Sequence, residues 1–314
     1  VGLPERTLEA CLGANAVLLG AVGHPKFDGR RPQERPEAAI LALRQALGGF
    51  ANLRPSVCYP ALARRTPYQP ERVRGANVLI LRELLGGLYY GEPRGFEASG
   101  NTAFNTMIYS RHEIERIARV AFERARERKK QLASIDKANV LETSQLWRAV
   151  VTEVGKAYPD VALEHVFVDA AAMRLAIAPT SFDVMLCENL FGDILSDQAA
   201  SIAGSLGLLP SATIGGKIDL YEPVHGSAPD IAGKGIANPI GAIASAAMLL
   251  RYSARMEREA SDIDHAIEDA LAAGARTKDI AGPGERVLST REMGQAIEDA
   301  LNEARDRKHS YHAV

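Results

Sequence analysis

Asp193 and Asp197 are the two residues whose type and spacing first indicate chemistry. Residues four apart in a helix lie on the same helix face, where two carboxylates repel each other by about 0.2–0.5 kcal/mol. A cation between the two side chains removes that repulsion, and carboxylate oxygens suit a hard divalent ion such as Mg²⁺ or Mn²⁺. The pair therefore indicates part of a metal site, although a solvated helix face has the same spacing.

The elements around this pair are readable from the sequence. Phe182–Cys187 is a short, almost wholly apolar run, which predicts a strand buried on both faces. Asn189 and Gly192 then indicate a turn, so a helix is expected to begin at Asp193. The aspartates would accordingly lie just beyond the carboxyl end of a strand, where α/β sheets bind ligands.

Lys137 and Asp169 occupy comparable positions. Lys137 ends a short predicted strand that includes Ser134, and Asp169 follows the predicted strand Val161–Val168. Both residues would therefore lie at the same edge of a sheet as Asp193. An aspartate that only caps a helix would occupy the same place as Asp169, so that alternative stays open.

Three arginines could bind a substrate with two carboxylates. Arg44 lies on a predicted helix, Glu37–Leu47; Arg54 follows it, and Arg82 comes directly after a predicted strand, Asn77–Leu81. A guanidinium group pairs with a carboxylate through two parallel hydrogen bonds, so three arginines near element ends suit such a substrate. Each of them could instead be an ordinary surface residue, because most arginines are exposed.

Three further segments lack a helical period. Gly20–Gly29 and Tyr221–Asn238 are rich in glycine and proline, and glycine lets backbone N–H groups approach a ligand closely. Neither contains the dinucleotide-binding G-x-G-x-x-G pattern or a Walker A loop. Gly86–Asn101 predicts a β-hairpin arm, which either projects to another subunit or is a surface hairpin.

The composition limits the class of protein. The chain has 314 residues, a net charge of −2, 46% hydrophobic residues and 24% charged residues, which are typical of a globular protein. This charge argues against binding to nucleic acid or to a membrane surface, and no apolar run approaches the length of a membrane span. Three cysteines, far apart, give no disulfide framework, so we expect a cytoplasmic protein. A sheet domain of this kind rarely begins with a helix such as Pro4–Leu12, so we expect an earlier segment to precede it.

Seven motifs together resemble those of one family, the β-decarboxylating dehydrogenases that include isocitrate and isopropylmalate dehydrogenases. They occur in the order of the family: Arg35–Arg44, Asn52–Pro55, Arg82–Gly95, Asp136–Leu141, Val168–Met173, Asn189–Asp197 and Glu222–Pro239. The resemblance implies two α/β domains that share a central mixed sheet, unlike a Rossmann domain, with a β-arm at a dimer interface. It assigns residues 1–49 and 204–314 to a cofactor-binding domain, and residues 50–203 to substrate binding, metal binding and dimerisation.

The resemblance also implies roles for the reactive residues. Arg44, Arg54 and Arg82 would bind the substrate carboxylates. Mg²⁺ or Mn²⁺ would be held by Asp193 and Asp197 of one chain and by Asp169 of a second chain. The general base would be Lys137, also from the second chain, and Tyr89 would return a proton to the enol. The expected assembly is a homodimer with shared active sites.

The cofactor implied by the resemblance is NAD. Asp230 faces the adenosine ribose in the family, where a carboxylate accepts a hydrogen bond from the 2′-hydroxyl and repels a 2′-phosphate. The expected cofactor contacts are His24, Glu37, Asn189, His225, Gly226, Ser227, Ala228, Asp230 and Asn238. His24 departs from the family, which often has a second glycine there.

The substrate implied by the resemblance is 3-isopropylmalate, a 2-hydroxy dicarboxylate. Glu37, Ile40 and Leu41 would face its γ-substituent, and the two aliphatic side chains suit an isopropyl group; Asn139 and Asp169 would also contact the substrate. The expected activity is NAD-dependent oxidative decarboxylation to 4-methyl-2-oxopentanoate, a step of leucine biosynthesis. A methyl-sized difference is worth only about 1–3 kcal/mol, so a D-malate or tartrate dehydrogenase remains an alternative. A catalytically silent paralogue that acts as a binding subunit is another.

Overall fold

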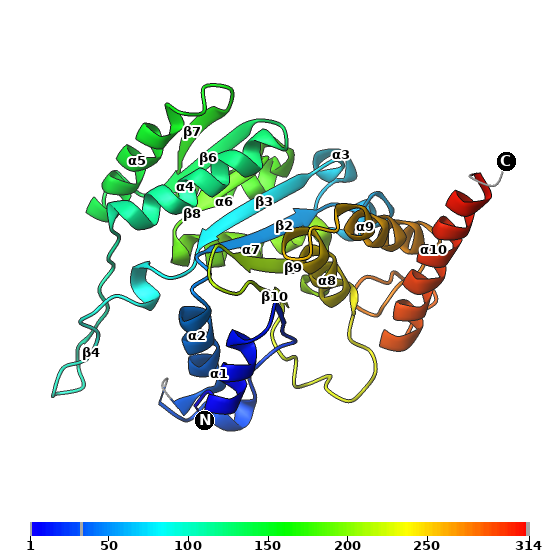
Figure 1. The fold of residues 1–314 in the computed structure, drawn as a ribbon, viewed down its shortest axis with the longest axis horizontal. Helices are drawn as coiled ribbons and strands as arrows, with labels where there is room; N and C mark the ends of the chain where they lie inside the picture. The colour runs from blue at the N-terminus through cyan, green and yellow to red at the C-terminus, as the bar shows by residue number, and fades with distance from the viewer. Residues whose placement is uncertain (1, 32–33, 312–314) are drawn as a thin grey trace.

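The chain folds around one continuous mixed β-sheet (Figure 1). The computed structural model describes residues 2–31 and 34–311, without the side chains of 307–311. Its eight strands have the order β1-β10-β9-β2-β3-β8-β6-β7. They are β1 (Val17–Leu18), β2 (Ala51–Val57), β3 (Asn77–Glu83), β6 (Gln131–Asp136), β7 (Ala162–Phe167), β8 (Val184–Cys187), β9 (Pro210–Ile214) and β10 (Leu220–Pro223).

The sheet contains both kinds of strand pairing. Strands β3, β8, β6 and β7 run parallel, whereas β2 is antiparallel to both of its neighbours, β3 and β9. The parallel strands end at one edge of the sheet, where Arg82 pairs in register with Cys187. The mixed sheet predicted from the sequence is confirmed. The division into two domains stays a prediction.

Helices cover both faces of this sheet (Figure 1). The α-helices that frame it are α1 (Glu5–Leu12), α2 (Pro36–Leu47), α3 (Pro70–Val73), α4 (Arg111–Arg126), α5 (Glu142–Gly155), α6 (Val168–Ile177), α7 (Asn189–Ala203), α8 (Ile240–Tyr252), α9 (Glu257–Ala272) and α10 (Thr290–Tyr311). None of the helices within the described residues combines the length and the apolar character that a membrane span needs.

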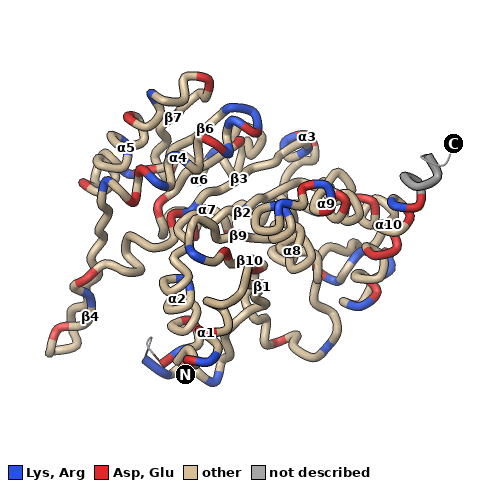
Figure 2. Tube along the Cα trace, viewed as in Figure 1, with Lys and Arg blue, Asp and Glu red and all other residues tan. Residues whose placement is uncertain are grey.

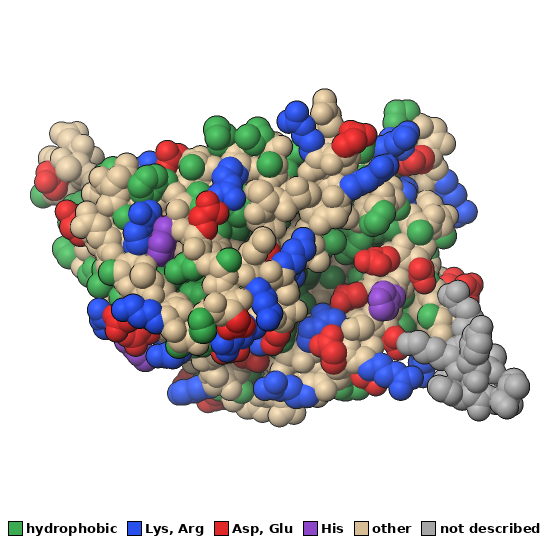
Figure 3. Space-filling model, turned by 90° about the horizontal axis from the view of Figure 1, so that it is seen from above, with side chains coloured by type: hydrophobic (Ala, Val, Ile, Leu, Met, Phe, Trp, Pro, Cys, Tyr) green, Lys and Arg blue, Asp and Glu red, His purple; other side chains and the backbone are tan. Residues whose placement is uncertain are grey.

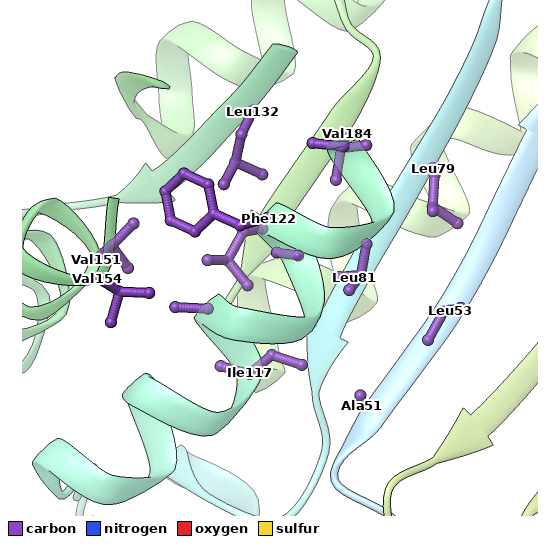
Figure 4. Packing of buried hydrophobic residues seen from close by; sticks show 14 of the residues in the cluster. Ala51, Leu53, Leu79, Leu81, Ile117, Phe122, Leu132, Val151, Val154 and Val184 are labelled. Atoms are coloured by element: carbon purple, nitrogen blue, oxygen red, sulfur yellow. The ribbon is translucent and has the colours of Figure 1, made fainter. Parts of the chain in front are cut away.

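Alternation along the strands explains the two layers. Leu79 and Leu81 of β3 pack with α4 and α5 in one hydrophobic cluster, part of which Figure 4 shows. Val78 and Ile80 point to the other face, into a cluster with α6 and α7. Both faces of β3 are therefore buried, which is why its sequence is a continuous apolar run. Arg82 follows Leu81 and so points to the α7 side.

Two sequence-based boundaries were wrong. The helix α7 begins at Asn189, four residues before Asp193, because the Glu188 carboxylate accepts hydrogen bonds from the Leu190 and Phe191 N–H groups and caps it. Gly192 therefore lies within the helix and forms no turn. The segment predicted as a loop from Tyr221 contains part of β10, and the irregular backbone begins only after Pro223.

The predicted arm is present. Strands β4 (Gly95–Phe96) and β5 (Ala103–Phe104) pair antiparallel and project away from the sheet (Figure 1). Phe96 is 77% exposed and Phe104 is 42% exposed, so the arm presents two aromatic side chains to its surroundings.

Charge is evenly distributed. Lysine and arginine alternate with aspartate and glutamate along the chain in Figure 2, and both kinds are interspersed over the face seen in Figure 3. The face seen in Figure 3 shows no broad patch of one charge.

Candidate active site

Three of the predicted reactive residues, Arg54, Arg82 and Tyr89, converge on Asp193. Its Oδ1 lies 2.5 Å from Arg82 Nη1 and 3.3 Å from Arg54 Nη1. Its Oδ2 accepts a hydrogen bond of 2.8 Å from the Tyr89 hydroxyl. One carboxylate on α7 thus joins residues from β2, from β3 and from the start of the arm.

The strand pairing explains why the two arginines meet. Asn52 of β2 pairs with Arg82 of β3, and Leu53 pairs with Leu81. Leu53 and Leu81 face the α4 and α5 side, so the residues next to them face α7. Arg54 is therefore a mid-strand residue whose side chain reaches the site through its face of the sheet, and it does not lie at an element end as we expected from the sequence.

Neighbouring side chains hold Arg54 in place. Its Nε donates to Asn52 Oδ1 at 2.7 Å and its Nη1 donates to Ser196 Oγ at 2.8 Å. Burial and the nearby charge of Arg82 lower the pKa of Arg54 to about 10, against the opposing effect of Asp193. Two buried guanidinium groups side by side disfavour their own charge, and an anionic ligand between them relieves that cost.

Arg82 is held by α7 as well. Its Nε and Nη2 both donate to Asn189 Oδ1, at 3.0 and 2.8 Å. Its guanidinium carbon lies 5.5 Å from the centre of the Tyr89 ring. Burial lowers the pKa of Arg82, and the charge of Asp193 opposes that shift. The structure thus places Asn189, an expected cofactor contact, directly on Arg82.

The third arginine comes from α2. Arg44 Nη2 donates to Glu222 Oε1 of β10 at 2.6 Å, and its Nε is buried with no hydrogen-bond partner among the described residues. Glu37, Ile40 and Leu41 precede Arg44 by seven, four and three residues, so all four lie on one face of α2. The structure therefore brings the expected substrate-facing residues to the same side of the helix as Arg44.

The carboxylates proposed for the metal divide into two groups. Asp193 and Asp197 both lie on α7, and Asp197 Oδ1 is 3.7 Å from Arg54 Nη1. Burial raises the pKa of Asp197, and the charge of Asp193 adds to that shift. Among the residues that the structure describes, no group of three His, Cys, Asp or Glu side chains could hold a metal within one chain. The α7 pair offers the oxygen donors that a hard divalent ion prefers, so it fits two ligands of such an ion.

Asp169 instead lies beside Lys137. Lys137 Nζ donates to Asp169 Oδ1 at 2.5 Å, and this contact holds the pKa of Asp169 below its usual range. Asp169 is 67% exposed at its side chain, and Asn139 is exposed. Lys137 follows Asp136, whose buried carboxylate accepts two hydrogen bonds from Arg148 and one from the Ala138 N–H group. This turn carries Lys137 and Asn139, and Lys137 reaches Asp169 in the first turn of α6.

Part of the expected cofactor site comes together near α2. A Cβ added to Gly23 would lie 3.2 Å from Glu37 Oε1 and 3.4 Å from Ser227 Oγ, so the two irregular loops meet at the start of this helix. His24, next to Gly23, accepts a hydrogen bond from the Lys26 N–H group through its Nδ1.

The remaining expected cofactor residues lie along the second loop. His225 Nδ1 donates to the Gly226 carbonyl at 2.8 Å, and Ala228 has a φ of +43°, in the left-handed region. Asp230 is exposed. Asn238 is buried and already bonded, to Asp279 and to the Ile240 N–H group at the start of α8.

The sequence analysis missed Asn52, Ser196 and Glu222, which position Arg54 and Arg44. A signal existed for two of them. Asn52 precedes Arg54 by two residues, so both lie on one strand face, and Ser196 follows Asp193 by three, so both lie on one helix face. Glu222 could not be linked to Arg44 from spacing, because 178 residues separate them.

Comparisons with known proteins show which family the chain resembles. The profile of the family described as isocitrate/isopropylmalate dehydrogenase matches residues 1–297. A 3-isopropylmalate dehydrogenase of Wolinella succinogenes is 55% identical over 298 residues, which cover 95% of this chain and 83% of that one. The corresponding enzyme of Geobacillus kaustophilus is 53% identical, with 95% and 81% covered.

Solved structures give the same result. The crystal structure of an isocitrate dehydrogenase from Methylococcus capsulatus superimposes with a TM-score of 0.85 at 35% identity, covering 95% of this chain and 85% of that one. A β-decarboxylating dehydrogenase from Thermococcus kodakarensis gives a TM-score of 0.78 at 37% identity, covering 96% and 82%. The chain therefore belongs to the isocitrate/isopropylmalate dehydrogenase family.

Proposed function

We propose that this protein catalyses the NAD-dependent oxidative decarboxylation of 3-isopropylmalate to 4-methyl-2-oxopentanoate, a step of leucine biosynthesis. The observation that carries the proposal is the convergence of Arg54, Arg82 and Tyr89 on Asp193. Relatives named 3-isopropylmalate dehydrogenase are 53–55% identical, whereas the solved isocitrate dehydrogenase is 35% identical, which supports this substrate over isocitrate.

The arginines account for recognition of a dicarboxylate. Arg44, Arg54 and Arg82 come from three different elements, and the charges of Arg44 and Arg82 both act on Arg54. A substrate carboxylate replaces part of the contact that Asp193 now makes with Arg54 and Arg82. The exchange favours an anion with two carboxylate groups, because each group can accept a pair of hydrogen bonds from a guanidinium group. Ile40 and Leu41, on the Arg44 face of α2, offer aliphatic contact to the γ-substituent and no partner for a third carboxylate.

The reaction requires a base, a hydride acceptor and an acid. Lys137 of the partner subunit removes the hydroxyl proton, and bound NAD⁺ would supply the acceptor for the hydride from C2, so that the product of this step is a 3-carboxy-2-oxo acid. The bond from C3 to its carboxyl group then breaks, CO₂ leaves, and the electron pair of that bond forms an enolate, which takes back the proton held by Lys137 to become the enol. Tyr89 donates a proton to C3 while the enol hydroxyl loses its proton to Lys137, which gives the 2-oxo acid. A general acid or base of this kind contributes about 10²–10⁴-fold to the rate.

A divalent ion, Mg²⁺ or Mn²⁺, suits the α7 carboxylates. We propose that Asp193 and Asp197 hold it together with Asp169 of the partner subunit. When bound, it acts as a Lewis acid that lowers the pKa of the substrate hydroxyl and stabilises negative charge. Burial, and to a lesser degree the charge of Asp193, raises the pKa of Asp197, and a cation beside the pair would offset both effects.

The exposed apolar surface supports a homodimer with shared sites. Met173 and Ile177 of α6 are 59% and 49% exposed, and Ile194 of α7, next to Asp193, is 57% exposed. Since α6 and α7 pack against each other, exposed apolar side chains on both helices favour an association face here. Because Asp193 and Asp197 lie on the same helix as Ile194, a second subunit on this face can bring its Lys137 and Asp169 to the site.

NAD is the proposed cofactor. Asp230 is exposed on the loop that carries Ser227, so its carboxylate is available to a ribose 2′-hydroxyl and repels a 2′-phosphate.

The three cysteines are free, which supports the cytoplasmic location expected from the sequence.

A substrate panel tests the activity. NADH formation is measured with Mg²⁺ or Mn²⁺ and with 3-isopropylmalate, D-malate, tartrate or isocitrate. We expect the highest kcat/KM with 3-isopropylmalate and with NAD⁺ over NADP⁺. A higher kcat/KM with malate or tartrate assigns the chain to the alternative enzyme, and no turnover with any of the four supports the silent paralogue.

Mixed dimers test the shared site separately. Lys137→Ala and Asp197→Ala are each expected to be inactive, and subunits of the two are exchanged in equal amounts. Half of the dimers are then mixed, and each has one site with both residues intact, so about a quarter of the wild-type activity returns. If Lys137 and Asp197 serve the same site within one chain, no activity returns.

A further inference from the structure

The Asn189 side chain has every one of its hydrogen-bonding groups in use. Its Oδ1 accepts from Arg82 Nε and Nη2, and its Nδ2 donates to the carbonyl oxygens of Leu84 at 3.2 Å and Gly86 at 2.9 Å. An asparagine amide has two acceptor positions and two donor hydrogens. Asn189 is also only 1% exposed. Its amide therefore has neither a free group nor an open face for a cofactor.

The backbone under this amide is fixed on two sides. Asn189 is the first residue of α7, and its N–H group donates to the Tyr109 hydroxyl at 2.9 Å. The buried carboxylate of Glu188 caps the same helix turn. Leu84 and Gly86, which receive the amide hydrogens, belong to the segment that directly follows β3. The amide thus ties the start of α7 to the end of the strand that carries Arg82.

The result is a guanidinium group with one orientation. With Nε and Nη2 both on Asn189, the remaining nitrogen, Nη1, is the one that points to Asp193. A guanidinium group is planar, so fixing two of its nitrogens also fixes the third. Arg54, by comparison, is oriented by Asn52 and Ser196. Both arginines next to Asp193 therefore have their own side-chain acceptors.

We propose that Asn189 is a positioning residue for Arg82: it holds the guanidinium group so that Nη1 faces the substrate carboxylate, and it makes no contact with the cofactor. The inference rests on the proposed function, because it assumes that Arg82 binds a carboxylate. It replaces the cofactor contact that the family motif suggested for Asn189. Loss of the amide should weaken binding of the dicarboxylate and leave binding of NAD⁺ nearly unchanged.

Kinetics of Asn189→Leu and Asn189→Asp test this. Leucine is similar in size and removes the side-chain oxygen that accepts both hydrogen bonds from Arg82. KM for 3-isopropylmalate is therefore expected to rise about 10- to 100-fold, the loss typical of hydrogen bonds to a charged group. KM for NAD⁺ is expected to change by less than about 3-fold, because no cofactor contact is lost. Aspartate keeps an acceptor oxygen for Arg82 but replaces Nδ2 with an oxygen that faces the Leu84 and Gly86 carbonyls, so its KM for 3-isopropylmalate should rise less than that of Asn189→Leu without reaching the wild-type value.

Asn77→Leu is the matched control. Asn77 is the first residue of the same strand, and its Oδ1 accepts from Arg128 Nη2 at 2.9 Å, far along β3 from Arg82. The variant removes the same kind of contact and should leave both KM values as in wild type. If Asn189→Leu fails to fold, Asn189→Ser, which retains one acceptor oxygen, is measured in its place and is expected to show a smaller rise in the same KM.

The two KM values decide the inference. A rise in KM for 3-isopropylmalate alone supports it. A rise in KM for NAD⁺ alone, or no change in either, overturns it while the proposed function stands. If the wild-type protein does not oxidise 3-isopropylmalate, the proposed function fails, and the same variants are compared for calorimetric binding of malate, which carries the same two carboxylates. Weaker malate binding to Asn189→Leu than to Asn77→Leu then supports the inference alone, and equal binding overturns it.

Discussion

Gly192 lies where α7 presses against the stem of Arg82. A Cβ added to this residue would lie 2.7 Å from Arg82 Cγ, 2.8 Å from its Cβ and 3.2 Å from its Cα. These are atoms close to the backbone of β3, so the stem of Arg82 cannot swing away from the contact. Replacing Gly192 by alanine would therefore force α7 away from the strand, and Asp193, the next residue, would move with it.

Two effects of opposite sign set the magnitude for Gly192→Ala. Alanine is favoured over glycine within a helix by about 1 kcal/mol. Overpacking by one methyl group in a rigid contact costs about 1–3 kcal/mol. Because every close atom belongs to the stem or backbone of Arg82, we expect the upper part of that range. The net result is a loss of about 1–2 kcal/mol in the free energy of unfolding.

Denaturant unfolding and kinetics test Gly192→Ala, with Gly294→Ala as the control. Gly294 lies within α10, and a Cβ added there would meet no atom within 4 Å, so only the helix preference acts. Gly294→Ala is expected to stabilise the protein by about 0.5–1 kcal/mol, and Gly192→Ala to destabilise it and raise KM for 3-isopropylmalate. A Gly192→Ala protein as stable as Gly294→Ala, with wild-type KM, would show that α7 does not pack on Arg82 as described.

Two further substitutions test the neighbourhood of the site. Burial and the charge of Arg148 lower the pKa of His165 below its usual 6.5, so the unfolded chain binds more protons there and stability is lost as pH falls below about 6.5. His165→Gln should flatten the dependence of the unfolding free energy on pH between about 7 and 5, and a slope equal to that of wild type would contradict this assignment. Tyr89→Phe keeps the ring beside Arg82 but removes the proposed acid, so kcat should fall by about 10²–10⁴-fold with little change in substrate KM. Tyr90→Phe, next to it, is the control, and equal kcat values for the two variants would remove Tyr89 from the reaction.

Strand periodicity and motif order allowed much of the fold to be predicted. The run Phe182–Cys187 was expected to be a strand buried on both faces, and β8 places Val184 with one hydrophobic cluster and Met185 with the other. The helical stripe around Asp193 was expected for the same reason. The strand prediction and the helix prediction both depend on apolar side chains that recur every two to four residues, and this spacing is visible in the sequence.

The start of α7 shows what spacing could not reveal. Asn and Gly are typical of turns, so Asn189 and Gly192 were interpreted as a turn before the helix. The structure gives each a tertiary role instead: Asn189 binds Arg82, and Gly192 leaves room for the Arg82 stem. Arg82 is 107 residues away from Asn189 in the sequence, and no local pattern records that contact.

One stripe of α7 now connects these findings. Residues 189, 192, 193, 196 and 197 are spaced by three or one, so they lie along a single helix face. Asn189 orients Arg82, and Gly192 leaves room for the Arg82 stem. Asp193 pairs with both arginines. Ser196 then orients Arg54, and Asp197 adds a second carboxylate. The spacing of Asp193 and Asp197 alone suggested a cation between two like charges. The arginines show that the same carboxylates also balance buried positive charge, so the proposed substrate and metal ion would act on one network. Binding of a dicarboxylate to Arg54 and Arg82 weakens their hold on Asp193, which frees that carboxylate for a cation; we therefore expect substrate and Mg²⁺ to bind cooperatively, each strengthening the other.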